Sequence, residues 1–211
     1  MIWKYIFNLE DFNVQSYKFN FLLFKLKTNT FTLLFILYQS ISVAQQYETQ
    51  SFDLIKKVDE AEIRFYPPAI KIRSSRKNGF GALFGYISGR NSNDQKIAMT
   101  TPVYLAKNED NEVMEFVLPR SIDKSNAPEP LSEKVEVYES RSGYYIAHSF
   151  GGYAFDWTVQ RATKSLMEII QENKIEAVGD PIILVYDSPY KIINRKNEVL
   201  LKINYQTKIK K

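Results

Sequence analysis

Two stretches with helical spacing, each lying between two pairs of strand-like segments, constrain the fold of this chain more than any other feature. In the first half the order is Ala61–Tyr66, Ala69–Arg73, the helical stretch Asn78–Gly89, Lys96–Ala106 and Glu112–Leu118. In the second half it is Val135–Glu139, Tyr144–Phe150, the helical stretch Phe155–Gln171, Ile182–Tyr186 and Glu198–Ile203. The pattern predicts an α+β fold in which two β-β-α-β-β units form one antiparallel sheet or a distorted barrel, with two helices packed on it. A cleft between two similar halves would be a natural site for a small molecule.

The first helical stretch lacks the charged face that a surface helix usually has. Its apolar residues follow the i, i+3, i+4, i+7 spacing of a single helix face and are Phe80, Leu83, Phe84 and Ile87. A second stripe contains only small residues, namely Gly81, Gly85 and Ser88. No charged residue occurs between Asn78 and Gly89. We therefore expect another group to approach the small side closely, and the apolar stripe to be either core or part of a ligand groove.

The composition excludes several kinds of active site. The 211 residues include no cysteine, so disulfides, thiolate metal sites and cysteine nucleophiles are excluded. No base is paired with a nucleophile, no phosphate-binding loop is present, and Glu115 and Glu136 fit solvated strand positions, so we expect no enzymatic activity. The net charge of +4 is not gathered into a basic face, so we expect no nucleic-acid partner.

The single histidine, His148, lies in a strand-like segment, where alternation places it on the same face as Tyr144 and Ile146. As the only imidazole, it is the only histidine that could bind iron. The alternative is a hydrogen-bonded strand histidine that binds no ligand.

The first 44 residues have the features of a removable export signal. A positive start, an apolar run and a small-x-small cleavage pattern follow one another at Lys25 and Lys27, Phe31–Leu37 and Ser42–Ala44. The apolar run is shorter than the roughly 20 residues of a membrane-spanning helix. The alternative is a retained anchor or a buried helix. An export signal rarely has so long an aromatic segment before its positive start as residues 1–24. We therefore also expect translation to start downstream, near Leu26.

The segment Thr100-Thr101-Pro102 interrupts an otherwise regular strand pattern. Proline cannot donate a hydrogen bond to a neighbouring strand and is found at strand edges, starts and bulges. One interpretation is that the strand bends at the boundary between the two halves, so that the threonine hydroxyls face the cleft and contact a ligand. The other is a plain β-bulge without ligand contact.

Six short motifs resemble the SOUL family of haem-binding proteins and occur in that family's order. They are K-I-A-M-T-T-P-V at Lys96–Val103, F-V-L-P at Phe116–Pro119, A-P-E-P at Ala127–Pro130, F-G-G-Y-A at Phe150–Ala154, Y-D-S-P at Tyr186–Pro189 and R-K-N-E-V at Arg195–Val199. The resemblance implies a distorted antiparallel β-barrel with two flanking helices and an internal pseudo-twofold repeat. It also implies reversible, non-covalent binding of haem or another tetrapyrrole, without known catalysis. The fold is similar to sensing domains of some bacterial transcription regulators, which bind flat hydrophobic cations.

The resemblance also implies that an apolar groove near the first helix contacts the tetrapyrrole. The helix positions carried over are Phe80, Leu83, Phe84 and Ile87, with Tyr86 nearby. This helix has no basic residue, so Arg90 and Lys96 are the nearest candidates to pair with propionates. Some relatives were proposed to ligate iron through an early histidine, and Gln45–Lys96 contains none, which leaves His148 as the possible axial ligand.

These observations predict an exported, monomeric, non-enzymatic domain, residues 45–205, that binds haem or a related tetrapyrrole for carriage or buffering. We expect it in the periplasm or secreted, with a basic tail at residues 206–211 and no membrane span after signal removal. Apolar burial, worth about 25 cal/mol per Å², would hold the ligand rather than a metal bond. Two alternatives are a sensing module for other flat amphipathic molecules and an interaction domain whose groove receives a protein or membrane partner.

Overall fold

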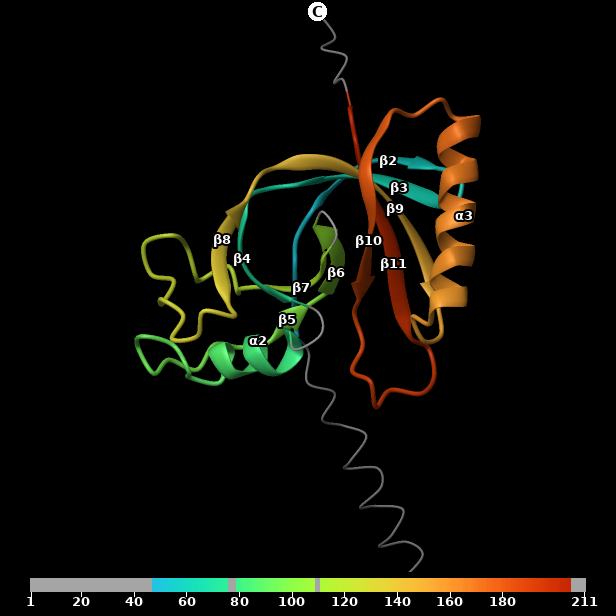
Figure 1. The fold of residues 1–211 in the computed structure, drawn as a ribbon. Coiled ribbons are helices and arrows are strands. Elements are labelled where there is room, and N and C mark those ends of the chain that lie inside the picture. The colour runs from blue at the N-terminus through green and yellow to red at the C-terminus, as the bar shows by residue number, and fades with distance from the viewer. Residues whose placement is uncertain (1–46, 76–78, 109–110, 206–211) are drawn as a thin grey trace, which may run out of the picture. The chain divides into compact units, whose positions relative to one another are not determined.

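The computed structural model describes residues 47–75, 79–108 and 111–205 (Figure 1), so the predicted export signal and basic tail lie outside the described residues. The strands are β1 (Glu48–Thr49), β2 (Asp53–Val58), β3 (Ala61–Tyr66), β4 (Ala69–Ser75), β5 (Thr100–Thr101), β6 (Val103–Asn108), β7 (Asn111–Val117), β8 (Glu136–Ser140), β9 (Gly143–Gly151), β10 (Ala177–Val185) and β11 (Lys196–Ile203). The helices are α2 (Gly79–Ile87) and α3 (Asp156–Glu172). The second half has the predicted order β8-β9-α3-β10-β11, whereas in the first half the short strand β5 is inserted between α2 and β6, so that the predicted strand Lys96–Ala106 is divided.

Nine strands form one large sheet in the order β2-β3-β9-β11-β10-β6-β7-β4-β8, and every pairing within it is antiparallel. β1 and β5 form a separate parallel pair. The predicted α+β class is confirmed, but the barrel is not closed. Among the described strands the order of pairing ends at β2 and β8, and these two edges do not pair with each other.

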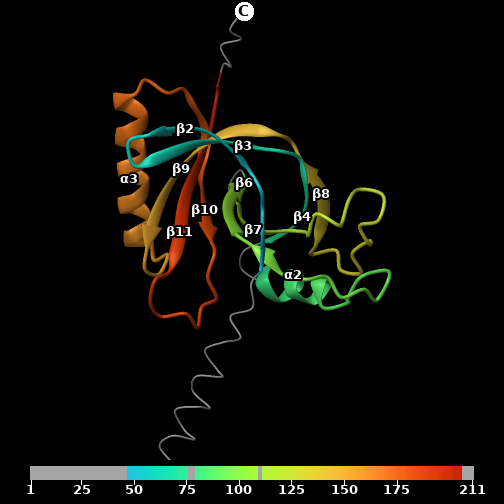
Figure 2. The same ribbon diagram turned by 180° about the vertical axis from the view of Figure 1, so that it is seen from behind.

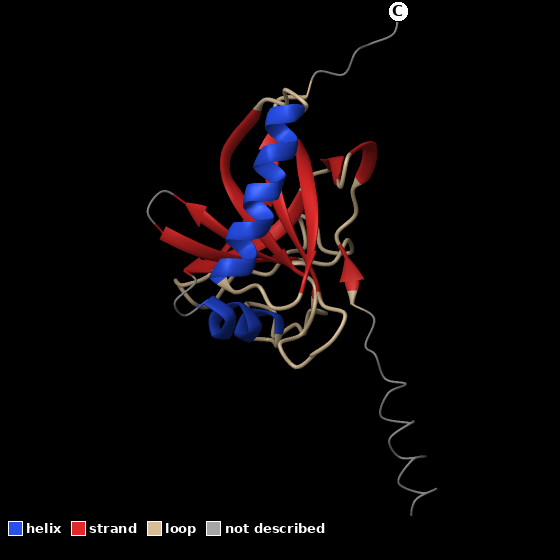
Figure 3. Ribbon diagram, turned by 90° about the vertical axis from the view of Figure 1, so that its right-hand side faces the viewer, coloured by secondary structure: helices blue, strands red, loops and turns tan. Residues whose placement is uncertain are grey.

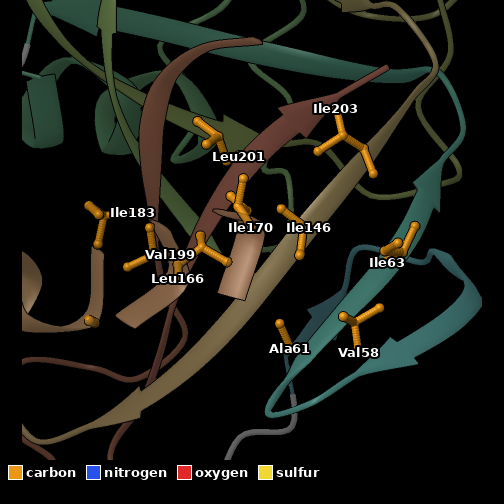
Figure 4. Packing of buried hydrophobic residues seen from close by; sticks show 11 residues of the cluster. Val58, Ala61, Ile63, Ile146, Leu166, Ile170, Ile183, Val199, Leu201 and Ile203 are labelled. Carbon is orange, nitrogen blue, oxygen red and sulfur yellow. The ribbon is translucent and has the colours of Figure 1, made fainter. Parts of the chain in front are cut away.

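The two helices pack on different parts of the sheet (Figures 1 and 2). Helix α3 lies along β9, β10 and β11, crossing in front of the strands in Figure 3. It buries Ala162, Leu166 and Ile170 against the cluster drawn in Figure 4, which includes Ile146 and Val199. Helix α2 packs on β4 and β7 over a second cluster. Each helix therefore has its own core, because each one covers a separate half of the sheet.

A third cluster occupies the face of the sheet turned away from both helices. Successive strand residues point to opposite faces of a sheet, and two residues of β3, three positions apart, show this arrangement. Ile63 belongs to the α3 core, whereas Tyr66 belongs to the third cluster. At the boundary between the halves, β10 pairs with β6, and Leu184 lies opposite Tyr104 with both residues buried. The boundary where we predicted a cleft is therefore packed with side chains.

Candidate functional site

The solvent side of α2 carries two half-exposed phenylalanines. Phe80 is 52% exposed and Phe84 is 50% exposed, and their rings stack with centroids 5.7 Å apart and planes 9° from parallel. Phe80 also meets the ring of buried Phe116 edge-on at 5.9 Å. Gly81 of the same helix and Ser88, the residue directly after it, are also exposed. We call Phe80, Gly81, Phe84 and Ser88 the α2 outer face, which is apolar or small at every position and carries no charge.

The other predicted residues of this helix belong to the core. Leu83 is fully buried, and Tyr86 and Ile87 are 1% and 5% exposed. The Tyr86 hydroxyl donates a hydrogen bond of 2.6 Å to the carbonyl of Pro128, and burial raises the pKa of this phenol to about 12. The predicted stripe therefore divides into two core residues, Leu83 and Ile87, and the exposed stacked pair.

The small side of α2 is approached closely at one glycine. A Cβ built on Gly85 would lie 3.0 Å from the Nε atom of Arg90, so the guanidinium lies directly against the glycine backbone. At Gly81 a Cβ would meet nothing within 4 Å. The expected close approach is confirmed at Gly85, and the approaching group is the protein's own arginine, whereas the space beside Gly81 stays open.

Asn91 organises the turn that carries the two cations predicted to contact the ligand. It is 1% exposed, and its amide nitrogen donates to the carbonyls of Tyr86 at 2.9 Å and Gln95 at 2.8 Å. Its side-chain oxygen accepts the N–H of Gln95 at 3.1 Å. These bonds tie the turn to the end of α2 and hold Arg90 and Lys96, which are both exposed, beside that end. Sequence reasoning missed Asn91, although the run R-N-S-N-D is typical of a turn.

On the face of the sheet turned away from both helices, which we call the helix-free face, a buried carboxylate forms an ion pair with a buried arginine. Glu198 has no exposed side-chain surface, and its two oxygens accept from Arg64 at 2.7 and 2.9 Å. The Tyr186 hydroxyl donates to the same carboxylate at 2.7 Å. Burial alone would raise the pKa of Glu198, but Arg64, Tyr186 and Lys196 lower it to about 2. Glu198 is therefore ionised and fully engaged by the protein itself.

A second buried pair stands on the same face, in the other half of the sheet. Lys71 lies 3.2 Å from Glu115, and Tyr138 donates to the other oxygen of that carboxylate at 2.9 Å. The Lys71 ammonium sits 3.4 Å from the ring centroid of Tyr104, and burial lowers the pKa of Lys71 despite the attraction of Glu115. The prediction that Glu115 is solvated is wrong, because it is 8% exposed.

The segment that begins the described chain closes this face. Gln50 accepts a hydrogen bond from the Tyr104 hydroxyl. The Phe52 ring lies 5.4 Å from that of Tyr66, tilted by 45°, and 4.1 Å from the Arg64 guanidinium. Figures 1 and 2 show this blue-to-cyan segment running from the end of the domain that holds α2 up to β2. The helix-free face is therefore covered by the protein's own chain.

The two predicted threonines hold this segment in place. Thr100 is 3% exposed and donates to the carbonyl of Val117 at 2.5 Å. The hydroxyl of Thr101 lies 3.0 Å from that of Thr49, and β5 pairs with β1 at these residues. Pro102 follows through a cis peptide bond and separates β5 from β6. The hydroxyls of Thr100 and Thr101 both have partners within the protein.

The cavity described beside Gly81 and Gly85 is too small to enclose a porphyrin. It measures about 70 Å³ and is lined by Gly81, Gly85 and Arg90 among others, whereas ligand pockets usually hold roughly 300–1,000 Å³. Clefts of about 280, 300 and 380 Å³ lie elsewhere and are lined by no residue of α2. A flat molecule at α2 would therefore lie on the exposed outer face, where we had expected a groove.

Comparison with known proteins identifies the family. The family model described as "SOUL heme-binding protein" matches residues 47–202, nearly all of the described domain. The chain belongs to the SOUL family. It is 30% identical over 165 residues to heme-binding protein 2 of Homo sapiens, covering 70% of this chain and 80% of the relative. It is 27% identical over 158 residues to heme-binding protein 2 of Mus musculus, covering 66% and 76%.

Two solved structures share the fold of this SOUL protein. The EcmrR–DNA complex has a TM-score of 0.51 at 10% identity, covering 92% of this chain and 69% of that one. A hydrolase from Listeria innocua has a TM-score of 0.50 at 9% identity, covering 69% and 92%. At these identities the similarity concerns the fold alone. No helix in the described part of this SOUL chain has the length and apolar character required to cross a membrane.

His148, the predicted axial ligand, does not meet α2 in this SOUL domain. It is 8% exposed on β9, which packs on α3, whereas α2 packs on β4 and β7. Its Nδ1 atom lies 3.2 Å from the carbonyl of Glu60. Ile146 shares its face and belongs to the α3 core, as the alternation predicted. Among the described residues, no three of His, Asp or Glu gather closely enough to hold a metal ion.

Proposed function

We propose that this SOUL protein binds haem or a related tetrapyrrole non-covalently on the α2 outer face. The observation that carries the proposal is the parallel pair Phe80 and Phe84, half-exposed on a helix that has no charge on any face. A solvent-facing helix surface is normally polar, so an uncharged aromatic one calls for a partner. Family membership and the name of the human and mouse relatives support a tetrapyrrole as that partner.

Apolar contact supplies most of the binding energy in this proposal. A phenylalanine presents roughly 200 Å² of surface, so two half-exposed rings leave about 200 Å² available to a ligand. A flat molecule covers about half of that, which is worth roughly 2.5 kcal/mol at 25 cal/mol per Å². The open space over Gly81 lets the macrocycle approach the helix backbone beside the rings.

The charged edge of a tetrapyrrole needs cations, and the turn after α2 offers them. Arg90 and Lys96 are exposed, and Asn91 holds their turn against the helix end. Arginine suits a carboxylate because its planar fork can make two parallel hydrogen bonds. In this arrangement Arg90 and Lys96 would pair with propionates while the rings contact the macrocycle.

The iron receives no histidine from this site. His148 is held in the sheet on the side of α3, and it is the only histidine of the chain. The residues present therefore fit the macrocycle and its propionates but not axial ligation by imidazole. We propose that binding is weak, reversible and non-catalytic, which would suit carriage or buffering. We extend the proposal to an exported, monomeric protein, which detection of a native N-terminus at Gln45 and gel filtration would test.

The strand order supports the predicted internal repeat. β6 and β10 pair at the centre of the sheet, flanked by β7 and β11 respectively. The next strands outward are β4, beside β7, and β9, beside β11, and each of these two strands is followed in the chain by a helix. Under this proposal Glu115 on β7 and Glu198 on β11 occupy equivalent places in the two halves.

For the alternative of a sensing module for other flat amphipathic molecules, the resemblance suggests hydrophobic cations as ligands, and such cations find less support. Such a ligand needs a carboxylate without a cation, surrounded by aromatic rings. In the boundary between the halves both carboxylates already have internal cations, Lys71 and Arg64, and both cations lie over aromatic rings. The protein's own Lys71 and Arg64 thus provide the positive charge that a cationic ligand would bring to these carboxylates.

A haemin titration of the full chain tests the proposal. We expect a Soret shift with the wild type, and an affinity roughly 10- to 100-fold lower for the variant Phe80→Ser/Phe84→Ser, from the 2.5 kcal/mol above. Phe155→Ser is the matched control, because Phe155 is 56% exposed on another element. His148→Gln should leave the spectrum unchanged. Equal affinity of the wild type and the double variant, or no shift at all, would overturn the proposal.

A further inference from the structure

We propose that the loop between β10 and β11, together with the start of α3, docks this domain onto an anionic phospholipid bilayer. The proposal goes beyond tetrapyrrole binding and uses none of the residues of α2. Tyr190, Ile192 and Ile193 of this loop are 90%, 77% and 74% exposed. They are the three most exposed large hydrophobic side chains of the described residues. Clustered apolar exposure of this kind marks an interaction surface.

The loop is held from inside, so its outward side chains are displayed by a fixed backbone. Arg195 is 7% exposed, and its Nη1 atom donates to the carbonyls of Ser188 and Lys191, both at 2.6 Å. Asp187 accepts the backbone N–H of Lys196 at 2.6 Å and pairs with the Lys191 ammonium at 2.7 Å. Because the buried arginine binds two carbonyls of the loop, the loop backbone is ordered, although the apolar side chains of the loop remain exposed to water.

The start of α3 extends the same surface. The Tyr153 hydroxyl donates to the carbonyl of Pro189 in the loop at 3.3 Å, and the Arg195 guanidinium lies 4.2 Å from the Tyr153 ring. Tyr153 in turn stacks on Phe155 at 5.5 Å. Phe155 and Trp157 are 56% and 58% exposed. The loop and the helix start therefore form one patch, which we call the docking patch: Phe155, Trp157, Tyr190, Ile192 and Ile193.

The chemistry of the docking patch fits a bilayer surface. Its aliphatic residues are adjacent in the loop, and its tyrosine and tryptophan are the residue types enriched at membrane–water interfaces. The Arg161 guanidinium lies 5.3 Å from the Trp157 ring, and Lys191 and Lys196 belong to the loop and its end. The carboxylates nearby are Asp156, Asp187 and Glu198, the last of which lies 3.2 Å from Lys196 and is shared with Arg64. Against these three, the cations Arg161, Lys191, Arg195 and Lys196 leave a small net positive charge. Basic groups beside an apolar patch favour an anionic lipid surface.

Trp157 provides a reporter inside the docking patch. The chain has two tryptophans, and Trp3 lies outside the described residues. In the full-length variant Trp3→Phe, the emission of Trp157 is measured with vesicles of equimolar phosphatidylcholine and phosphatidylglycerol. We expect a blue shift, and quenching when the lipids carry bromine on the acyl chains. Because the signal comes from the docking patch, binding through residues 1–46 alone would not produce it.

The decisive variant is Ile192→Ser/Ile193→Ser in the same background. Both side chains are about three-quarters exposed, so the fold should be kept, as circular dichroism would verify. We expect vesicle binding to weaken about tenfold or more, because the apolar area available for insertion is removed. Leu131→Ser is the control, since Leu131 is 68% exposed outside the docking patch, and should bind as before.

Three outcomes would overturn the proposal. The first is an unchanged Trp157 emission in the presence of vesicles. The second is equal vesicle binding by the double serine variant and its parent. The third is a blue shift that depends on protein concentration without vesicles, which would assign the docking patch to self-association. Haemin affinity is measured separately with the Phe80→Ser/Phe84→Ser variant, so failure of either proposal leaves the other intact.

Discussion

Replacing Glu198 by glutamine should cost about 3 kcal/mol of folding free energy at neutral pH. The reason is the difference between the pKa of this carboxyl in the folded chain, about 2, and its ordinary value of 4.5. Each tenfold change in proton affinity is worth about 1.4 kcal/mol, so the ionised carboxylate contributes roughly 3 kcal/mol. Glutamine keeps the shape of the side chain but leaves Arg64, which is 3% exposed, with only the partly exposed Glu62 as counter-charge. Breaking a buried ion pair costs about 3–5 kcal/mol, in agreement with this value.

The pH dependence follows from the direction of the shift. The pKa of Glu198 is lowered on folding, so the unfolded chain binds this proton more readily than the folded one. The stabilisation is complete at pH values above about 4.5, and is lost as the pH falls from there towards 2. The difference between the wild type and Glu198→Gln should therefore shrink over this interval.

Urea denaturation followed by circular dichroism at several pH values measures both effects. The control is Glu136→Gln, whose partner Arg73 is one-third exposed in a pair that should be worth less than about 1 kcal/mol. Haemin affinity of the folded Glu198→Gln variant should equal that of the wild type, since Glu198 lies on the helix-free face. A loss below about 1 kcal/mol, or a deficit that stays constant on acidification, would refute the reasoning.

Three further substitutions test the geometry around α2 and β5 by urea denaturation. Gly81→Ala should raise stability by about 0.5–1 kcal/mol, because the site is helical and open, and a loss would contradict the open space there. Gly89→Ala should lower it by about 1–3 kcal/mol, because Gly89 has a φ of +110°, and an unchanged midpoint would argue against that backbone. Thr100→Val should cost about 1–3 kcal/mol by removing the donor to the Val117 carbonyl, whereas a neutral result would show that this hydrogen bond does not anchor β5.

The order of the elements was predictable because its signals are local. Alternation within a strand and the spacing of apolar residues within a helix depend on neighbours a few residues away. The predicted strand Ala69–Arg73, for example, lies within β4 (Ala69–Ser75). Closure of the sheet depends instead on pairing between distant segments, which short-range patterns do not encode. The pattern of elements therefore left a single antiparallel sheet and a distorted barrel as alternatives, the resemblance favoured the barrel, and the structure has the open sheet.

The site was predicted less well, for a reason that lies in the composition of α2. In a helix without charged residues, the sequence does not indicate which side faces solvent. The apolar stripe could therefore not be divided into buried and exposed positions. The spacing grouped Leu83 and Ile87 with Phe80 and Phe84, although the first two are buried and the others are half-exposed.

The buried ion pairs were not predicted from the sequence, for a different reason. Lys71 and Glu115 are 44 residues apart in sequence, and Arg64 and Glu198 are 134 apart. Arg64, Lys71 and Glu115 alternate with apolar neighbours in their strands, which is also the pattern of a solvated position. Glu198 follows the polar pair Lys196-Asn197, so its sequence context also suggests exposure. Only the pairing of strands reveals that a cation and a carboxylate meet on a covered face.

The position of β11 has a consequence for biosynthesis. This strand is the last element of the described chain, yet it lies inside the sheet between β9 and β10. While a ribosome still holds those final residues, β9 and β10 have no partner between them, and Arg64 has no Glu198. Native pairing can then form only after β11 has been synthesised and is accessible, and deletions that remove β11 should abolish folding because they remove an interior strand of the sheet.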